Sequence, residues 1–212
     1  MEGKNLITIA MSRGRLLTEA VELFAKAGID IQAVTKDSRK LIFDFDDLGL
    51  KILITRPTDV PSYVEYGAAD CGIVGKDTLL ESSANLYEPL DLKIGKCRLV
   101  VAAPNGFSME NRSSLRIGTK YPKVSSEFFV AKGISAEIVK LNGSVELAPL
   151  AGLSDVIVDL SASGETLKTN NLFEIESIAE ITARVVVNKV SLKVKSKEIR
   201  TLIEKLKKQR MR

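Results

Sequence analysis

Short strand-like runs alternate with helix-like runs along almost the whole chain, and this alternation constrains the fold more than any other feature. Residues 6–11 form a continuous apolar run, as in a buried strand, and residues 15–27 follow with a helical pattern that stops at Gly28. The same order recurs at residues 50–54 and 60–67. Strands that alternate with helices predict an α/β fold with a largely parallel sheet.

The remaining expected elements continue this plan through the 212 residues, a length that can bury one large core or two smaller ones. The sequence contains no apolar run of the ~18 residues that a membrane span needs, and its start resembles a strand more than a secretory signal, so we expect a cytoplasmic protein. Further strands are expected at residues 41–45, 71–74, 98–103, 115–118, 136–141 and 155–160, helices at 124–132 and 145–151, and a β-rich run at 173–188.

The chain has no histidine, and this restricts its chemistry. Acid–base catalysis near neutral pH would need an Asp, Glu, Lys or Cys with a shifted pKa, and His-dependent triads and His-ligated metals are disfavoured. Cys71 and Cys97 lie in apolar runs without CxxC spacing, so we expect buried, reduced thiols and no zinc site.

The net charge is +4, and residues 193–212 are visibly basic. A nucleic-acid-binding tail is one interpretation of this segment. We favour an amphipathic terminal helix with a solvated basic face, and hence no nucleic-acid partner. The apolar positions with helical spacing are Ile199, Leu202, Ile203 and Leu206.

Polar and glycine-rich clusters follow the expected strands. Each cluster lies at a strand-to-helix junction, which is where open α/β sheets bind ligands. Loops at this edge are polar in every α/β protein, so their position alone does not identify a binding site. The residues of each cluster must show whether it binds a ligand. They occupy residues 12–15, 56–59, 75–77, 119–120 and 159–166.

The most informative cluster is DVIVDLSASGETL, residues 155–167. A buried strand ends near Asp159, a short turn follows, and a helix is expected to start at residues 164–166, where backbone N–H groups can bind a phosphate. An ordinary helix cap at Ser163 is the alternative, but the carboxylate ahead of the turn favours a sugar phosphate. The turn has neither P-loop nor dinucleotide spacing. The hydroxyl groups of Ser161 and Thr166 are further hydrogen-bond donors, and Gly164 lets the backbone approach a ligand closely.

Two arginine clusters suggest sites for further anions. Arg56 directly follows a strand, where its guanidinium can bind a phosphate or carboxylate. Arg13 and Arg15 lie in a strand-to-helix turn that suits a polyphosphate, although a plain surface turn is equally compatible with them. Asp70 precedes a short strand and could contact a ligand or belong to a solvated turn.

Together these clusters resemble the ATP phosphoribosyltransferase family, whose motifs they match in order over about residues 8–190. AMSRGRL is similar to A-x-x-K-G-R-L, and RPTDVPSYVEYGAADCGIVGKD to R-x-x-D-V-P-x-Y-V-x-x-G-x-x-D-x-G-I-x-G-x-D. DVIVDLSASGETLKTNNL is similar to D-x-I-V-D-x-x-x-T-G-x-T-L-x-x-N-x-L, the loop that binds phosphoribosyl pyrophosphate. Arg13 replaces a common Lys, and Ser163 replaces a common Thr.

The resemblance implies two α/β lobes like those of a type II periplasmic binding protein, with the active site in the interlobe cleft. Lobe I would hold residues 1–92 and 179–212, and lobe II residues 93–178. The chain resembles the short form of the family, which lacks the C-terminal regulatory domain. A hetero-oligomer with a regulatory subunit similar to histidyl-tRNA synthetase is therefore implied.

The implied reaction joins N1 of ATP to C1 of 5-phosphoribosyl 1-pyrophosphate and releases pyrophosphate, assisted by Mg²⁺ that bridges substrate oxygens. It is the first step of histidine biosynthesis. We expect Arg13, Arg15, Arg56 and Asp70 to bind ATP, with Arg56, Arg15 and Asp159 as catalytic residues. A non-catalytic solute-binding module is the alternative. Asp159 would bind the ribose, and the 5′-phosphate would contact Ser161, Ala162, Ser163, Gly164, Glu165 and Thr166.

Overall fold

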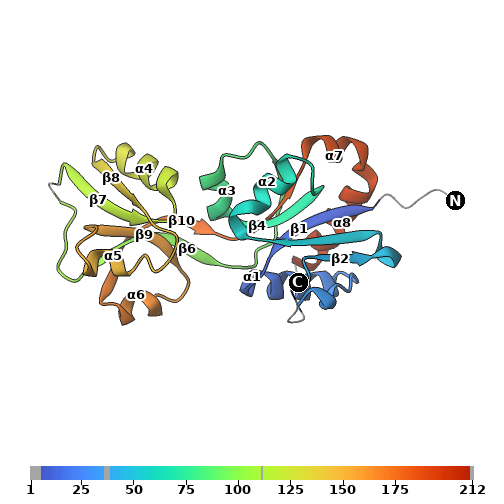
Figure 1. Ribbon diagram of the computed structural model, residues 1–212, viewed down its shortest axis with the longest axis horizontal. Coiled ribbons are helices and arrows are strands. Elements are labelled where there is room, and N and C mark those ends of the chain that lie inside the picture. The colour runs from blue at the N-terminus through green and yellow to red at the C-terminus, as the bar shows by residue number, and fades with distance from the viewer. Residues whose placement is uncertain (1–5, 36–38, 111, 211–212) are drawn as a thin grey trace. The chain divides into compact units, whose positions relative to one another are not determined.

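The computed structural model describes residues 6–35, 39–110 and 112–210, and the chain divides into two compact units (Figure 1). Unit 1 comprises Met1–Gly95 and Thr182–Arg212, and unit 2 comprises Lys96–Ile181. The chain therefore passes between the units twice. The boundaries expected from the sequence, 92/93 and 178/179, lie three residues earlier at each crossing.

Unit 1 is built on a sheet with the strand order β2-β3-β1-β4-β11-β5. β1 pairs in parallel with β3 and β4, whereas β2 is antiparallel to β3, and β11 is antiparallel to β4 and β5. The expectation of a largely parallel sheet is therefore wrong, because a hairpin and a returning strand add antiparallel pairs. The strands are β1 (Ile7–Ser12), β2 (Ile42–Phe45), β3 (Leu50–Thr55), β4 (Cys71–Gly75), β5 (Tyr87–Asp91) and β11 (Ala183–Val187).

Helices cover both faces of this sheet, which explains why its central strands are apolar on both sides. Ile9 and Met11 of β1 join the core under α1 and α8, while Ala10 between them packs with Val60 and Val64 of α2. The helices are α1 (Arg15–Lys26), α2 (Val60–Glu65), α3 (Lys76–Ser82), α7 (Lys189–Val194) and α8 (Ser196–Arg210), with 3-10 turns η1 (Gln32–Thr35), η2 (Asp46–Leu48) and η3 (Pro57–Asp59).

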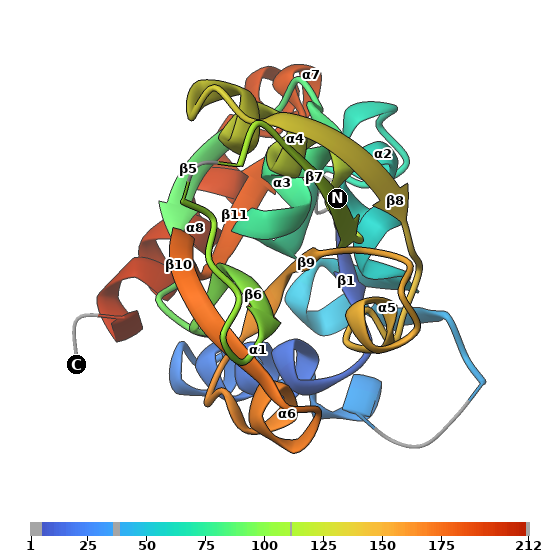
Figure 2. The ribbon, with the colours of Figure 1, turned by 90° about the vertical axis from the view of Figure 1, so that its left-hand side faces the viewer.

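Unit 2 has a second mixed sheet, with the strand order β10-β6-β9-β7-β8 (Figure 2). β7 pairs in parallel with β8 and β9, whereas β6 is antiparallel to both β9 and β10. β6 and β10 are the strands that connect unit 2 to the rest of the chain. The strands are β6 (Cys97–Pro104), β7 (Ser114–Thr119), β8 (Ser135–Lys140), β9 (Val156–Ser161) and β10 (Leu172–Ile181).

Three short helices pack on this sheet in the described part of unit 2: α4 (Pro122–Ala131), α5 (Leu147–Leu150) and α6 (Glu165–Thr169). α4 lies on β7 and β8. Ala148 of α5 and Leu167 of α6 pack in one core with Val100 and Ile157 of the sheet. This packing holds the β9–α6 junction on a rigid support. No helix within the described ranges is both long and apolar enough to cross a membrane.

Candidate active site

The arginines of unit 1 gather at one edge of its sheet. β1 and β3 are parallel neighbours whose last paired residues are Ser12 and Thr55. Arg13 and Arg56 are therefore the next residues of two adjacent strands, and Arg15 begins α1 immediately afterwards. The structure thus brings the three predicted arginines to the carboxyl edge of the sheet, the edge at which open α/β sheets bind ligands.

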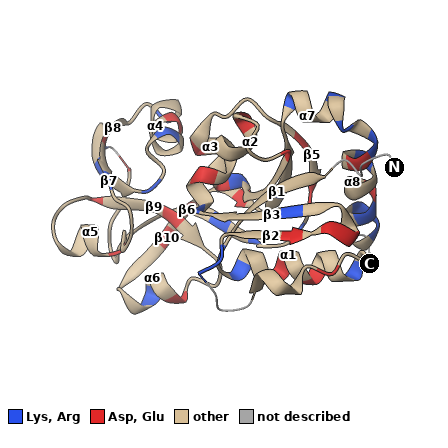
Figure 3. Cartoon of the chain, turned by 45° about the vertical axis from the view of Figure 1, so that its right-hand side comes forward, with Lys and Arg blue, Asp and Glu red and all other residues tan. Residues whose placement is uncertain are grey.

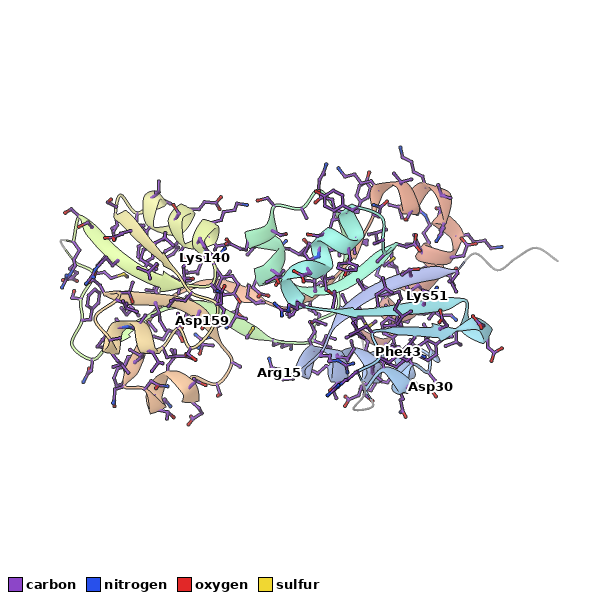
Figure 4. All side chains as sticks on the ribbon, in the orientation of Figure 1. Arg15, Asp30, Phe43, Lys51, Lys140 and Asp159 are labelled. Carbon is purple, nitrogen blue, oxygen red and sulfur yellow. The ribbon has the colours of Figure 1, made fainter. Side chains whose placement is uncertain are left out.

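These arginines differ in the contacts they make inside unit 1. Arg13 Nη2 donates a hydrogen bond to the carbonyl of Lys40 at 2.9 Å. Arg15 lies 3.4 Å from the carboxylate of Glu19 and keeps 61% of its side chain exposed (Figure 4). Arg56 is exposed, and its guanidinium group forms no hydrogen bond or ion pair with the described residues. Arg56 is therefore the cation of this edge with the most freedom to bind an anion.

The β9–α6 turn of unit 2 has the form that the sequence predicts. Asp159 lies on β9, partly exposed, and its Oδ1 accepts a hydrogen bond from the N–H of Leu160 at 2.8 Å. Gly164 adopts φ +79° immediately before α6, a conformation that costs residues with a Cβ about 1–2 kcal/mol. The helix has no side-chain cap, so the alternative of an ordinary cap at Ser163 is not what the structure shows.

The amides of this turn are available for an anion. Within the described chain, no hydrogen-bond acceptor reaches the N–H groups of Ala162, Ser163, Gly164 and Thr166. The N–H of Glu165 reaches the hydroxyl of Ser163 only at 3.4 Å, which is a weak contact. Free amides that converge before a helix favour the binding of a phosphate-sized anion.

The hydroxyl of Ser161 adds a second observation at the same turn. Ser161 is only 4% exposed, and its Oγ has no hydrogen-bond partner in the described part of the chain. A Cβ built on Gly164 would lie 4.0 Å from this oxygen, so the two positions are neighbours. Because an unsatisfied buried hydroxyl costs about 1–3 kcal/mol, a ligand that bonds to Ser161 would remove that cost.

Two lysines that the sequence analysis did not assign also belong to this edge of unit 2. In the sheet, Thr119 pairs with Val158 on one side and with Lys140 on the other. Lys120, one residue beyond that pair, is therefore in register with Asp159. Both lysines are exposed, and Figure 4 labels Lys140 and Asp159 in unit 2. Strand register is the signal that reveals them, since the lysines are 19 or more residues away from Asp159 in sequence.

Asp70 is not brought together with the arginines. It precedes β4 and is bonded to Thr8 in both directions, by the N–H of Thr8 to Asp70 Oδ2 and by the N–H of Asp70 to the carbonyl of Thr8, each at 2.8 Å. Thr8 is near the start of β1, whereas Arg13 follows its end. At ~3.3 Å per residue, the two levels of the sheet are about 16 Å apart.

The carboxylate of Asp70 is also fully used by the C-terminal helices. Ser191 Oγ donates to Oδ1 and Lys195 Nζ donates to Oδ2, both at 2.7 Å, and the Asp70 side chain is 8% exposed. Burial, the negative charge of Asp70 and the opposing effect of Lys195 together raise the pKa of the neighbouring Cys71 thiol to about 12. These contacts give Asp70 a structural role, while its role in nucleotide binding stays a prediction, and burial above all keeps Cys71 protonated.

The two edges can therefore bind different parts of polyanionic ligands. Unit 1 supplies guanidinium groups, and unit 2 supplies free amides, a buried hydroxyl and a carboxylate suited to sugar hydroxyls. The described residues contain no cluster of three or more His, Cys, Asp or Glu side chains that could hold a metal ion.

Comparison with known proteins decides the family. The model of the ATP phosphoribosyltransferase family matches residues 56–208. The chain is 54% identical over 206 residues to the ATP phosphoribosyltransferase of Citrifermentans bemidjiense, covering 95% of this chain and 97% of the relative. The chain belongs to the ATP phosphoribosyltransferase family. The enzyme of Moorella thermoacetica is 47% identical over 211 residues, covering 96% and 92% of the two chains.

Solved structures agree with this membership in the family. The ATP phosphoribosyl transferase (HisG:HisZ) complex from Thermotoga maritima contains a chain that is 35% identical, with a TM-score of 0.84 and coverage of 97% and 99%. The substrate binding protein of an amino acid ABC transporter has a TM-score of 0.60 at 15% identity, covering 97% and 93%, which shows a shared fold alone. The relation to periplasmic binding proteins expected for an ATP phosphoribosyltransferase is confirmed at the level of the fold, and the non-catalytic alternative is not favoured.

Proposed function

We propose that this chain joins N1 of ATP to C1 of 5-phosphoribosyl 1-pyrophosphate and releases pyrophosphate, as the first step of histidine biosynthesis. In this reaction a C–N bond forms as the C1–O bond to pyrophosphate breaks, with inversion at C1. N1 of adenine already carries a lone pair, so no general base is needed, which suits a chain without histidine. The free amides of the β9–α6 turn carry this proposal, because they offer the phosphate site that the reaction requires.

The β9–α6 turn would hold the phosphoribosyl group. The amides of residues 162–166 and the Ser161 hydroxyl would bind the 5′-phosphate, while the Asp159 carboxylate would accept hydrogen bonds from the ribose hydroxyls. Orientation of C1 for in-line attack is the main benefit of such a clamp. The unsatisfied Ser161 Oγ and the φ of +79° at Gly164 support these roles.

The arginines of unit 1 would bind the remaining negative charge. We assign Arg13 and Arg15 to the phosphates of ATP and Arg56 to the departing pyrophosphate, because Arg56 has no competing partner among the described residues. A guanidinium that contacts the leaving group stabilises the transition state more than the ground state. Asp70 is left out of the site, since both its oxygens are bonded within unit 1.

The residues of this turn fit a Mg²⁺ ion that would be bound mainly by oxygens of the substrate. The turn offers few carboxylates, Asp159 and Glu165, and Mg²⁺ commonly keeps few protein ligands when phosphate oxygens are present. When bound, the ion would neutralise part of the negative charge on the pyrophosphate. In this scheme Asp159 would orient the ribose.

A regulatory subunit similar to histidyl-tRNA synthetase is the proposed partner. The support is the HisG:HisZ composition of the Thermotoga maritima complex, whose matched chain is covered over 99% of its length. Since ATP and phosphoribosyl pyrophosphate are intracellular metabolites, the proposed reaction also implies a cytoplasmic location.

The decisive experiment mixes the purified chain with ATP, phosphoribosyl pyrophosphate and Mg²⁺, with and without the regulatory subunit, and measures pyrophosphate release. Turnover that requires both substrates is expected. If the chain binds neither substrate and the assembled complex releases no pyrophosphate, the proposed function is wrong.

Arg56→Ala tests the assignment of the leaving group. We expect kcat to fall about 100-fold, as when a single preorganised donor is lost from a transition state. Steady-state kinetics separates the two possibilities: a rise in KM with unchanged kcat would assign Arg56 to ground-state binding. Arg200→Ala, at an exposed arginine of α8, serves as the control.

A further inference from the structure

A second concave site lies in unit 1 at the opposite edge of its sheet. Ile7 and Leu50, the first residues of β1 and β3, form its floor together with Ile29 and Leu202. The cavity measures about 320 Å³, which is enough for one or two large side chains. Each of these strands has six residues, about 20 Å, so this groove is remote from Arg13 and Arg56.

The wall of the groove that comes from α8 is basic. Lys197, Thr201 and Lys205 lie along one side of the helix, each four residues from the next, and all three line the groove. In the described part of the chain, the ammonium group of neither lysine forms an ion pair or a hydrogen bond. Glu198 also lines the groove, but it is already engaged in another interaction.

The charge of the whole α8 helix also favours an acidic partner. The sequence of α8 contains six basic and two acidic residues, a net charge of +4 that equals the net charge of the entire chain (Figure 3). The remainder of the chain is therefore neutral overall. A localised positive field of this kind attracts acidic partners and fixes their orientation.

The spacing of the two lysines favours an extended polypeptide over a small anion. Lys205 lies eight positions after Lys197 in the helix, a rise of about 12 Å. A small carboxylate would reach one of them, whereas an extended segment with acidic residues about four positions apart would reach both. Leu48, which is 41% exposed and lines the groove, offers an apolar contact for a side chain between those acids.

We infer that this groove binds an acidic segment of the regulatory subunit, in which a large apolar side chain is flanked by carboxylates. The apolar side chain would fill the cavity and the carboxylates would pair with Lys197 and Lys205. Such a buried anchor with a charged rim is typical of protein interfaces. The inference rests on the partner proposed above and assigns it a docking site.

The test titrates the purified chain with the purified regulatory subunit from the same organism. Calorimetry or analytical ultracentrifugation measures the Kd of the complex. We expect the double variant Lys197→Glu/Lys205→Glu to raise the Kd about 30-fold, because it replaces two attractions with repulsions. The control Lys193→Glu/Lys207→Glu makes the same change of charge on exposed residues outside the lining, and it should change the Kd less than about threefold.

A second pair of variants tests the apolar part. Leu48→Asp should weaken binding about tenfold, while Leu41→Asp, at a leucine that is 57% exposed and outside the lining, should not. Equal Kd values for the groove and control variants, or no complex with the wild-type chain, would overturn the docking site. Turnover is measured in parallel: a complex that forms but releases no pyrophosphate would refute the proposed reaction and leave the docking site standing.

Discussion

Asp70 in unit 1 and Asp159 in unit 2 both adjoin buried strands of a mixed sheet, yet the structure uses them differently. Asp159 lies toward the carboxyl end of β9, beside a turn in which the amides of Ala162, Ser163, Gly164 and Thr166 have no partner among the described residues. Asp70 precedes the amino end of β4 and receives hydrogen bonds from Thr8, Ser191 and Lys195. A carboxylate at the carboxyl end of a strand can contact a ligand, whereas one at the amino end is bonded to other parts of the fold.

The contrast also concerns what surrounds each carboxylate. Asn188, which adjoins Asp70, caps α7 through its Oδ1 and donates from Nδ2 to the carbonyls of Val64 and Glu65. This region therefore connects β4, α2 and the C-terminal helices by satisfied hydrogen bonds. The β9–α6 turn keeps unsatisfied groups instead, and a structure tolerates such groups mainly where a ligand completes them.

Asp70→Ala should have the largest effect on stability. The change leaves the half-buried Lys195 without its anion, and we expect the free energy of unfolding to fall by about 3 kcal/mol. Urea denaturation measures this loss. Asp44→Ala, which breaks the exposed pair with Lys51, should cost less than about 1 kcal/mol. A similar small loss for both variants would contradict the structural role of Asp70.

Asp91 shows that the carboxyl end of a strand is not sufficient to make a site. It ends β5, where burial raises its pKa, but hydrogen bonds from Lys93 and Thr182 and the charge of Arg184 outweigh burial and lower the pKa to about 2. Its oxygens are therefore committed within unit 1.

The pH dependence of stability tests this commitment. Because the folded pKa lies below the unfolded value of 3.8, Asp91 stabilises the fold above about pH 4, and this contribution is lost as the pH falls toward 2. Denaturation curves between pH 6 and pH 2.5 should show a smaller decline for Asp91→Asn than for the wild type. Identical declines would show that other carboxyl groups govern the acid sensitivity.

Asp155 and Asp159 allow the comparison along one short segment, β9 and the residue that precedes it. Asp155 lies just before β9 and accepts a hydrogen bond from the N–H of Arg116 at 2.7 Å, so it resembles Asp70. We expect Asp159→Asn to raise the Kd for phosphoribosyl pyrophosphate about 30-fold, or ~2 kcal/mol, since the amide forms weaker bonds to the ribose.

Asp155→Asn should leave that Kd unchanged and lower the unfolding free energy by about 1 kcal/mol. Calorimetry with phosphoribosyl pyrophosphate and thermal unfolding of both variants measure the two effects. The assignment of the ribose to Asp159 would fail if the two variants bound the ligand equally well.

Local patterns in the sequence predicted much of this arrangement. The apolar run before residue 12, the stop at Gly28 and the helical spacing of Ile199, Leu202 and Leu206 are confirmed by β1, α1 and the buried face of α8. The turn after Asp159 was also predictable, because a strand, a glycine and a helix start follow each other within a few residues.

Contacts between distant segments could not be predicted in this way. Ser191 and Lys195 are 121 and 125 residues from Asp70 in the sequence. The residues near Asp70 therefore do not predict that its carboxylate oxygens accept these hydrogen bonds. The mixed character of the sheets has the same origin, since β11 returns beside β4 from the far end of the chain. The register that aligns Lys120 with Asp159 likewise appears only once β7 and β9 are paired.

Gly164→Ala gives the smallest and most specific test of the β9–α6 turn. Gly164 and Gly133 both have positive φ, +79° and +73°, and at neither position would a Cβ clash. Alanine should therefore cost about 1 kcal/mol of stability at each position through backbone strain alone. Only Gly164→Ala should also raise the Kd for phosphoribosyl pyrophosphate, about fivefold, because its strain shifts the amides that bind the phosphate. Equal affinity in the two variants would mean that the phosphate is held elsewhere, and the lysines at the ends of β7 and β8 would then be the groups to examine.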